Sequence, residues 1–230
     1  MKIRQPVYSN TDNYKYCSTT AQHSFAIMDM RWKHPFTCIV SGPTGCGKSV
    51  FVFTILDNLT DMITPTPHKV IYCYGEYQSC FAMYPWIEFH EGLPKADMFN
   101  GTPSLVIIDD LMNETDDTVA NLFTKISHHR SVSVIYITQN VFHKGKQSRT
   151  ISLNAHYMVL FKSPRDAGQI GVLGRQLYPE NSKFLVAAFK DATSTPHSYL
   201  LLDLRPETQE GFRVRTNIFD GEKQIVYQPK

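Results

Sequence analysis

Short apolar runs recur along the chain from residue 36 onward, and most of them are unbroken by polar residues. Unbroken runs rich in Val and Ile indicate strands that are covered on both faces, as strands of a parallel sheet are. On this basis we expect strands at residues 36–40, 69–74, 86–90, 104–110, 131–138, 156–161 and 197–204.

Segments with helical periodicity lie between several of these runs. Residues 116–129 place Val119, Leu122, Phe123 and Ile126 on one face of a helix. Further helices are expected at residues 48–59, 165–178 and 181–190. Strands that alternate with helices are typical of α/β domains, so we expect a mainly parallel central sheet with helices on both faces.

The two ends of the chain differ from its middle. Residues 1–34 are polar and rich in tyrosine, and we interpret them as an N-terminal arm. Residues 35–204 hold all the expected strands and helices and form one domain. Residues 205–230 are polar again and are expected to form a loosely held C-terminal tail.

Residues 41–50, "SGPTGCGKSV", follow the first expected strand directly and lead into the first expected helix. Gly42, Gly47, Lys48 and Ser49 fit the G-x-x-x-x-G-K-[ST] phosphate-binding loop, also called Walker A. Such a loop curls its N–H groups around phosphate oxygens, which requires glycine, and the helix N-terminus favours the anion. The position between strand and helix makes a chance match improbable. The expected nucleotide-binding residues are Gly42, Pro43, Thr44, Gly45, Cys46, Gly47, Lys48, Ser49 and Val50.

Two acids follow the apolar run "LVII" at residues 105–108. In phosphate-loop NTPases an Asp at the end of a buried strand, the Walker B acid, holds Mg²⁺, and Asp109 is the candidate here. Asp110 could then polarise the attacking water. The alternative is that both acids only open a turn, where Asp is common. Gln139 ends the next strand and could sense the γ-phosphate or be a solvated loop residue.

The net charge of +2, from 23 basic and 21 acidic residues, does not by itself indicate nucleic acid or membrane binding. Any contact with nucleic acid must therefore be local. The stretch "HKGKQSR" at 143–149 carries Lys144, Lys146 and Arg149, which could touch phosphates without reading bases. A solvated surface loop is the alternative.

The five cysteines form no C-x-x-C pair and no zinc spacing, so we expect reduced thiols in an intracellular protein. Cys46 lies within the phosphate loop, which predicts sensitivity to thiol alkylation. The first residues lack the apolar core of a signal peptide, and no apolar run approaches the roughly 18 residues of a membrane span. We expect a soluble protein.

Three landmarks occur in the order "SGPTGCGKS", "LVIIDD" and a strand ending in "TQN". This order resembles the FtsK/HerA superfamily of ATPases, which couple hydrolysis to movement of double-stranded DNA. The stretches "HPFTCIVSGPTGCGKS", "VIYCYGEYQ", "SHHRSVSVIYITQN" and "GKQSRTISLNAHYMVLFKSPRD" resemble the viral genome-packaging ATPases of Polinton/Maverick-like elements and adintoviruses. These are small relatives of the poxvirus-type packaging ATPases. The resemblance covers about residues 34–175.

The resemblance implies a RecA-like (ASCE) phosphate-loop ATPase domain over residues 35–204, with ATP and Mg²⁺ as cofactors. It implies that Lys48 binds phosphate, that Ser49 and Asp109 hold Mg²⁺, and that Gln139 is the strand-end sensor. Asp110 stands where many relatives have glutamate. An arginine just before the sensor strand reaches the neighbouring subunit's site in this superfamily; Arg130 matches it, and Arg149 is the second candidate. Arg130 could instead be a charge at a helix C-terminus.

The function that we expect is a catalytic one: Mg²⁺-dependent ATP hydrolysis by an oligomeric ring that moves double-stranded DNA into a viral capsid through its portal vertex. The host nucleus or a virus assembly site is the implied location, with the virion as another. A helicase or DNA-loading ATPase is one alternative, which predicts aromatic side chains for base stacking. A nucleotide-switched binding protein with negligible turnover is the other.

Overall fold

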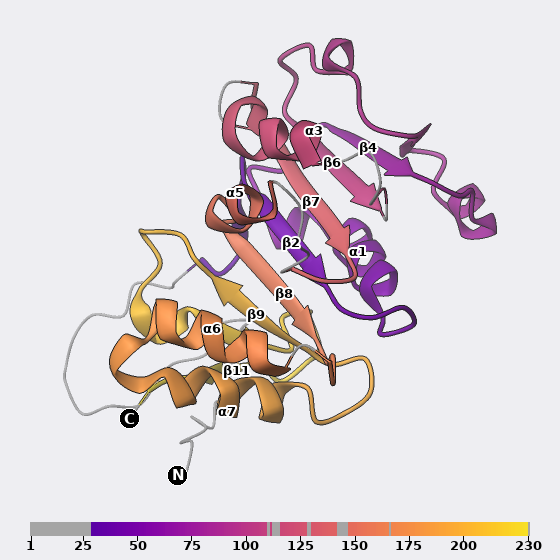
Figure 1. Cartoon of the computed structure of the whole chain (residues 1–230). Helices are drawn as coiled ribbons and strands as arrows, with labels where there is room; N and C mark the ends of the chain where they lie inside the picture. Colours follow the sequence, from indigo (N-terminus) through magenta and orange to yellow (C-terminus); the bar gives the residue numbers. More distant parts are fainter. Residues whose placement is uncertain are drawn as a thin grey trace.

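The computed structural model describes residues 29–109, 111, 116–127, 130–141, 147–165 and 167–229. The expected arm lies almost entirely outside the described residues. Most of the rest folds around one large sheet (Figure 1). Its strands are β2 (Thr37–Ser41), β4 (Lys69–Tyr74), β5 (Glu88–Glu91), β6 (Ser104–Asp109), β7 (Val132–Thr138), β8 (Tyr157–Phe161), β9 (Tyr199–Asp203), β10 (Val214–Thr216) and β11 (Ile225–Tyr227). A separate small pair joins β1 (Trp32–Lys33) to β3 (Ile63–Thr64).

The helices that cover this sheet are α1 (Lys48–Asp57), α2 (Leu59–Met62), α3 (Asp116–Asn121), the π-helical η3 (Leu122–Ile126), α5 (Ser148–Leu153), α6 (Ala167–Leu177) and α7 (Ser182–Ala192). Short 3₁₀ turns lie at η1 (Ser79–Met83), η2 (Ala96–Met98), η4 (Pro179–Asn181) and η5 (Glu210–Phe212). The helix expected at 116–129 is confirmed as far as Ser127, in two parts, and residues 128 and 129 lie outside the described residues.

The strand order is β11-β10-β9-β8-β2-β7-β6-β4-β5. The six strands from β8 to β5 run parallel, while β9, β10 and β11 are antiparallel additions at one side. The mainly parallel sheet is therefore confirmed. Strand β7 lies between β2, which precedes the phosphate loop, and β6, which ends in Asp109. This arrangement is the phosphate-loop NTPase fold of the RecA-like type.

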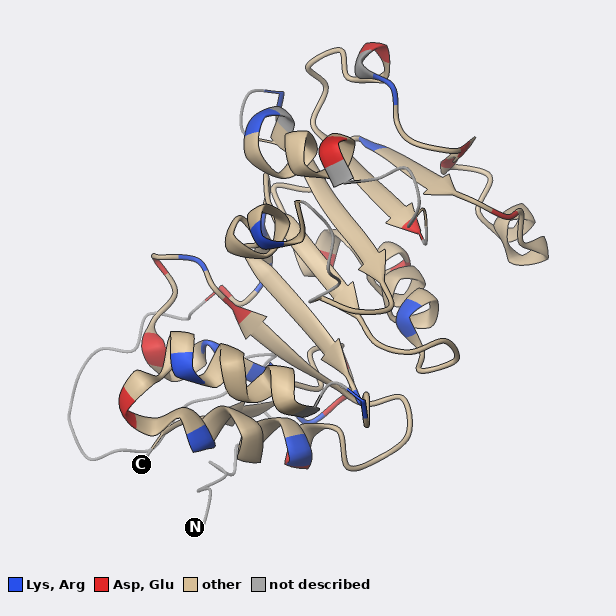
Figure 2. Ribbon diagram, in the orientation of Figure 1, with Lys and Arg blue, Asp and Glu red and all other residues tan. Residues whose placement is uncertain are grey.

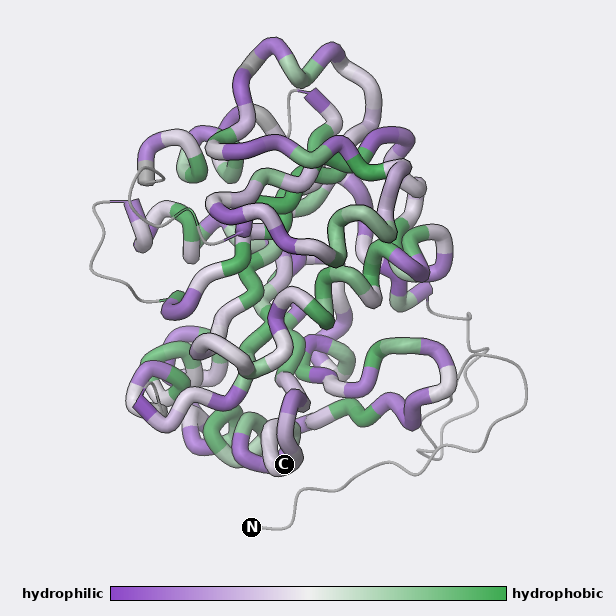
Figure 3. Tube along the Cα trace, turned by 90° about the vertical axis from the view of Figure 1, so that its right-hand side faces the viewer, coloured by the Kyte–Doolittle hydropathy of each residue, from purple (hydrophilic) through white to green (hydrophobic). Residues whose placement is uncertain are grey.

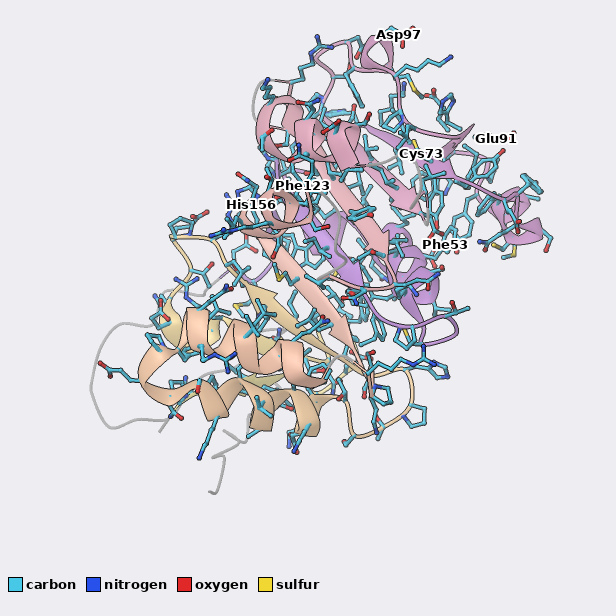
Figure 4. All side chains as sticks on the ribbon, in the orientation of Figure 1. Phe53, Cys73, Glu91, Asp97, Phe123 and His156 are labelled. Atoms are coloured by element: carbon cyan, nitrogen blue, oxygen red, sulfur yellow. The ribbon has the colours of Figure 1, made fainter. Side chains whose placement is uncertain are left out.

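Each face of the sheet carries its own apolar core. On β2, Cys38 and Val40 point into the core beneath α1, whereas Ile39 points into the core beneath the later helices. Phe53 of α1 and Phe123 of η3, labelled in Figure 4, belong to these two cores respectively. Hydrophobic residues follow the strands through the middle of the molecule (Figure 3). Burial on both faces explains why the strands read as unbroken apolar runs.

The segment expected as a loose tail is in fact part of the sheet. Strand β10 pairs with β9, and β11 pairs with β10. Arg215 of β10 forms a 3.0 Å ion pair with Asp203 of β9, and both side chains are buried. The expectation was wrong because β10 and β11 are only three residues each, and their apolar side chains are too few to stand out in a polar stretch. The domain boundary at residue 205 stays a prediction.

No helix in the described part of the chain is long and apolar enough to cross a membrane.

Candidate functional site

The residues singled out in the sequence meet at one edge of the sheet. Parallel strands end at the same edge, and the register pairs Ser41 of β2 with Thr138 of β7 and Ile137 of β7 with Asp109 of β6. Neighbouring strands are about 4.8 Å apart, so the end of β2 and Asp109 are separated by roughly 10 Å across the sheet. The phosphate loop, Asp109 and Gln139 therefore lie along one short edge, which we call the phosphate edge.

The glycines of the loop serve two different purposes. Gly45 and Gly47 have φ angles of 78° and 107°, in the left-handed region that favours glycine. Gly42 has no room for a side chain, because a Cβ there would lie 2.6 Å from Cβ of Phe161 and 2.7 Å from Sγ of Cys46. The Gly42 N–H also donates to the Thr138 carbonyl at 3.2 Å, which ties the loop to β7.

Lys48 is the first residue of α1 and folds back over the loop. Its ammonium donates to the carbonyls of Gly42 at 2.8 Å and Pro43 at 3.1 Å. Ser49 follows it in the first turn of α1 and is partly exposed, and Val50 is 70% exposed. The Lys48 ammonium and the N-terminus of α1 therefore lie together at the open side of the loop, where phosphate oxygens could bind.

Asp109 is buried at the end of β6, with only 9% of its surface exposed. The hydroxyl of Tyr72, on the adjacent strand β4, donates to its Oδ2 at 2.6 Å. Burial, and then the neighbouring Asp109 charge, raises the pKa of Tyr72 well above its usual range, so the hydroxyl stays protonated and remains a donor. One oxygen of the carboxyl group is thereby held in place.

Tyr72 also connects Asp109 to the phosphate-loop helix. Its ring is stacked on Phe53 of α1, with centroids 5.4 Å apart and planes within 9°. Tyr72 was not among the predicted site residues, because it lies inside an apolar run that indicates a core strand. The one available signal is its hydroxyl, since a buried tyrosine usually has a hydrogen-bond partner.

Gln139 follows β7 directly and is exposed at the phosphate edge, one residue beyond the carbonyl that anchors Gly42. Its position agrees with the one expected from the sequence. Asp110, the expected water-activating acid, lies outside the described residues, as do Lys144 and Lys146 of the basic stretch.

The structure separates the two candidate arginines from the phosphate edge of their own chain. Arg130 precedes β7 and donates to the Phe99 carbonyl at 3.2 Å. The length of β7, seven residues at about 3.3 Å each, puts roughly 20 Å between Arg130 and the phosphate edge. Arg149 is exposed on α5, and Asn154 just after that helix bonds to Thr37, the first residue of β2. Both arginines thus lie toward the opposite edge.

The described residues contain no group of three or more His, Cys, Asp and Glu that could hold a metal by themselves. Mg²⁺ in nucleotide enzymes is held by one or two protein groups together with phosphates and waters. Ser49 and Asp109 could supply those protein groups, because a hydroxyl and a carboxylate are both oxygen ligands.

Charged residues are otherwise spread over the helices and loops, and the central strands are almost free of them (Figure 2). In this view basic and acidic residues are interspersed on these elements. This mixture is in keeping with the net charge of +2.

Among solved structures, the chain is similar to the genome packaging NTPase B204 from Sulfolobus turreted icosahedral virus 2. The sulfate complex of B204 aligns at a TM-score of 0.47 and 11% identity, over 85% of this chain and 97% of that chain. The AMPPCP complex aligns at a TM-score of 0.44 and 12% identity, over 85% and 98%. At such values the similarity says nothing about function. No curated protein sequence matches the chain.

The family model of RNA helicases matches residues 38–154. This span is just over half of the 230-residue chain. It begins in β2 and ends just after α5, so it contains the phosphate loop, Asp109 and Gln139. The chain therefore belongs to the RNA helicase family.

Proposed function

We propose that this protein is a Mg²⁺-dependent ATPase that moves double-stranded DNA into a viral capsid. The observation that carries the hydrolytic part is the position of β7 between β2 and β6. That order places Gln139 between a phosphate-binding loop and a buried carboxylate, along one edge. A triphosphate held by the loop would have its γ-phosphate directed toward these two side chains.

Each residue of the phosphate edge has a role that its chemistry suits. Lys48 binds the β- and γ-phosphates, after exchanging its bonds to the loop carbonyls for bonds to phosphate oxygens. Ser49 and Asp109 would hold Mg²⁺, which would neutralise charge that develops on the phosphates. Asp110 orients the attacking water and accepts its proton, and Gln139 hydrogen-bonds the water or the γ-phosphate.

An arginine from a neighbouring subunit would complete the site. Arg130 lies roughly 20 Å from the phosphate edge of its own chain. The helix α5, which carries Arg149, ends beside the opposite edge. Each arginine is therefore better placed to reach a γ-phosphate in another copy. A homo-oligomeric ring in which one subunit's arginine enters the next subunit's site satisfies this geometry. Arginine suits the task because its charge is fixed and its fork matches phosphate oxygens.

The DNA contact is assigned to residues 143–149, whose three basic side chains would face the pore of the ring. One such segment per subunit provides a ring of charge that grips phosphates without reading sequence. The shell partner is a capsid or its portal vertex, and the location is the site of virus assembly or the host nucleus. These assignments depend on the resemblance to packaging ATPases.

A helicase is the second candidate, and the family match favours it. A helicase acting on single strands would need aromatic side chains for base stacking along its nucleic-acid path. Near residues 143–149 the sequence supplies only Phe142. For this reason we rank duplex translocation first. A nucleotide switch without turnover is the third candidate, and a dispensable Asp110 would favour it.

Two substrates separate the first two candidates. Displacement of a third strand from a DNA triplex reports movement along an intact duplex, and unwinding of a forked DNA or RNA duplex reports helicase activity. We expect ATP-dependent triplex displacement without fork unwinding, and neither activity in Lys48→Ala. Fork unwinding without triplex displacement would favour the helicase and contradict the packaging proposal.

A further inference from the structure

A cavity of about 300 Å³ opens beside the phosphate loop, on the side away from Asp109. One wall is formed by Gly45 and Cys46 of the loop itself. The other wall is formed by Lys162, just after β8, and by the turn of residues 194–198 between α7 and β9. This turn approaches the tip of β8 in Figure 1. The second wall lies outside the span that the family model matches.

The turn is held against the phosphate loop by the sheet. Tyr199, the first residue of β9, pairs with Phe161, the last residue of β8, and Phe161 in turn packs against Gly42. His197 lies directly over the start of α1: a Cβ built on Gly47 would be 3.4 Å from both Cβ and Nδ1 of His197. The cavity and the loop are therefore two parts of one surface.

The backbone conformation of the turn keeps His197 over the start of α1. His197 has a φ of 62°, an uncommon angle for a residue with a side chain. The next residue closes the turn, because the Ser198 hydroxyl donates to the Thr195 carbonyl at 2.6 Å. A strained position that its neighbours maintain is typical of binding sites.

The direction of a bound nucleotide follows from the strand order. Asp109 and Gln139 lie on the β7 side of β2, whereas the cavity lies on the β8 side. A triphosphate whose γ-phosphate points toward Asp109 therefore has its other end directed into the cavity. We propose that the cavity is the nucleoside site, which takes the ribose and the base of the nucleotide; this inference rests on the proposed function.

The lining suits a flat, neutral heterocycle with a hydrogen-bonding edge. It combines the proline ring of Pro196 and the imidazole of His197 with the hydroxyls of Ser194, Thr195 and Ser198. The described lining residues include no carboxylate, and Lys162 contributes the single ammonium group. A volume of about 300 Å³ is at the lower end of the range of small-ligand pockets, and a nucleoside is among the smaller ligands.

The test compares two ligands that share the phosphates but not the nucleoside. Binding of Mg²⁺–AMPPNP and of Mg²⁺–tripolyphosphate to the full chain is measured by calorimetry. We expect the wild type to bind AMPPNP at least tenfold more tightly than tripolyphosphate. His197→Gly removes the imidazole and accepts the positive φ, and Pro196→Ala removes the exposed ring. Both should reduce that ratio severalfold and leave the affinity for tripolyphosphate unchanged.

His68→Gly is the matched control, because His68 is also exposed but lies before β4, at the opposite edge of the sheet. It should keep the wild-type ratio. A wild-type ratio near one, or variants that keep the full ratio, would overturn the nucleoside site while the phosphate site stands. Failure of the folded wild type to bind either ligand would overturn the proposed function and this inference with it. If His197→Gly does not fold, the ratio of AMPPNP affinity to tripolyphosphate affinity in Pro196→Ala decides between these outcomes.

Discussion

The Tyr72 hydroxyl donates a 2.6 Å hydrogen bond to Oδ2 of Asp109, between two buried side chains on neighbouring strands. The same tyrosine ring is stacked on Phe53 of the phosphate-loop helix. The orientation of the Asp109 carboxyl group is therefore coupled to α1, the helix that follows the phosphate loop. Groups that orient metal ligands commonly matter almost as much as the ligands do.

Tyr72→Phe should raise the Mg²⁺ concentration needed for half-maximal ATPase activity by about tenfold or more, because Asp109 loses the group that orients it. The cost in free energy of unfolding should be only about 1–3 kcal/mol, since one buried hydrogen bond is lost. The measurement is an Mg²⁺ titration of ATP turnover, with urea unfolding alongside. Tyr227→Phe is the matched control, because it loses a similar hydrogen bond from a buried tyrosine, to Asp191, at the other border of the sheet. An unchanged Mg²⁺ requirement in Tyr72→Phe would show that the tyrosine is only part of the core.

Gly42→Ala should prevent nucleotide binding, because the added methyl group would meet Phe161 at 2.6 Å and Cys46 at 2.7 Å. The shifts that make room for the methyl group should lower the free energy of unfolding by about 1–3 kcal/mol and displace the loop. Gly168→Ala, in α6 where a Cβ meets nothing within 4 Å, is the control and should bind normally. The readout is AMPPNP affinity together with the unfolding midpoint. Normal binding by folded Gly42→Ala would contradict the tight packing of the loop.

Alkylation of Cys46 should be slow at neutral pH. Burial raises the pKa of the Cys46 thiol above its ordinary value, and the nearby Lys48 charge only partly opposes this. Since the thiolate is the reactive form, less of it is present at pH 7 than for an ordinary cysteine, and the rate should increase as pH rises toward the raised pKa. The sensitivity to alkylation that the sequence suggested is therefore expected to be weak at neutral pH.

Mass spectrometry of iodoacetamide-treated protein between pH 7 and pH 9.5 measures this rate, with partly exposed Cys80 as the internal reference. AMPPNP should protect Cys46 and leave Cys80 unaffected. Faster modification of Cys46 than of Cys80 at pH 7 would contradict the expected pKa direction.

Mixing two inactive variants should restore ATP turnover if an arginine acts between subunits. Lys48→Ala keeps both arginines but cannot bind phosphate, and Arg130→Ala keeps an intact phosphate edge. In a mixed ring, a Lys48→Ala subunit supplies the arginine to an Arg130→Ala neighbour. Equimolar mixtures should therefore regain a sizeable fraction of wild-type turnover. A second mixture, with Arg149→Ala in place of Arg130→Ala, identifies which arginine acts. An Arg130→Ala variant and an Arg149→Ala variant that both hydrolyse ATP normally would exclude both candidates.

Much of the fold could be predicted because its strands are buried on both faces. Such strands appear as unbroken apolar runs, and the expected and observed bounds of β4 coincide. Strands β10 and β11 were missed because three-residue strands at a sheet border have too few apolar positions to form a pattern. The pairing of β10 with β9, and of β11 with β10, depends on the three-dimensional path of the chain.

The phosphate loop could be predicted because its backbone demands glycine at fixed spacing, which is visible in one dimension. The role of Tyr72 could not, since it depends on the register between β4 and β6. The cavity beside the loop was missed for a similar reason. Gly45 and His197 are far apart in sequence and meet only because β9 runs antiparallel to β8.

Steady-state phosphate release from Mg²⁺–ATP is the decisive measurement for a DNA-packaging ATPase. It is measured over a series of protein concentrations with linear duplex DNA, single-stranded DNA, single-stranded RNA or no nucleic acid, and Lys48→Ala is the blank. We predict Lys48-dependent turnover that rises more than proportionally with protein concentration and is stimulated most by the duplex. Stronger stimulation by single strands would contradict the packaging motor in favour of a helicase. Nucleotide binding without Lys48-dependent turnover under any of these conditions would contradict both.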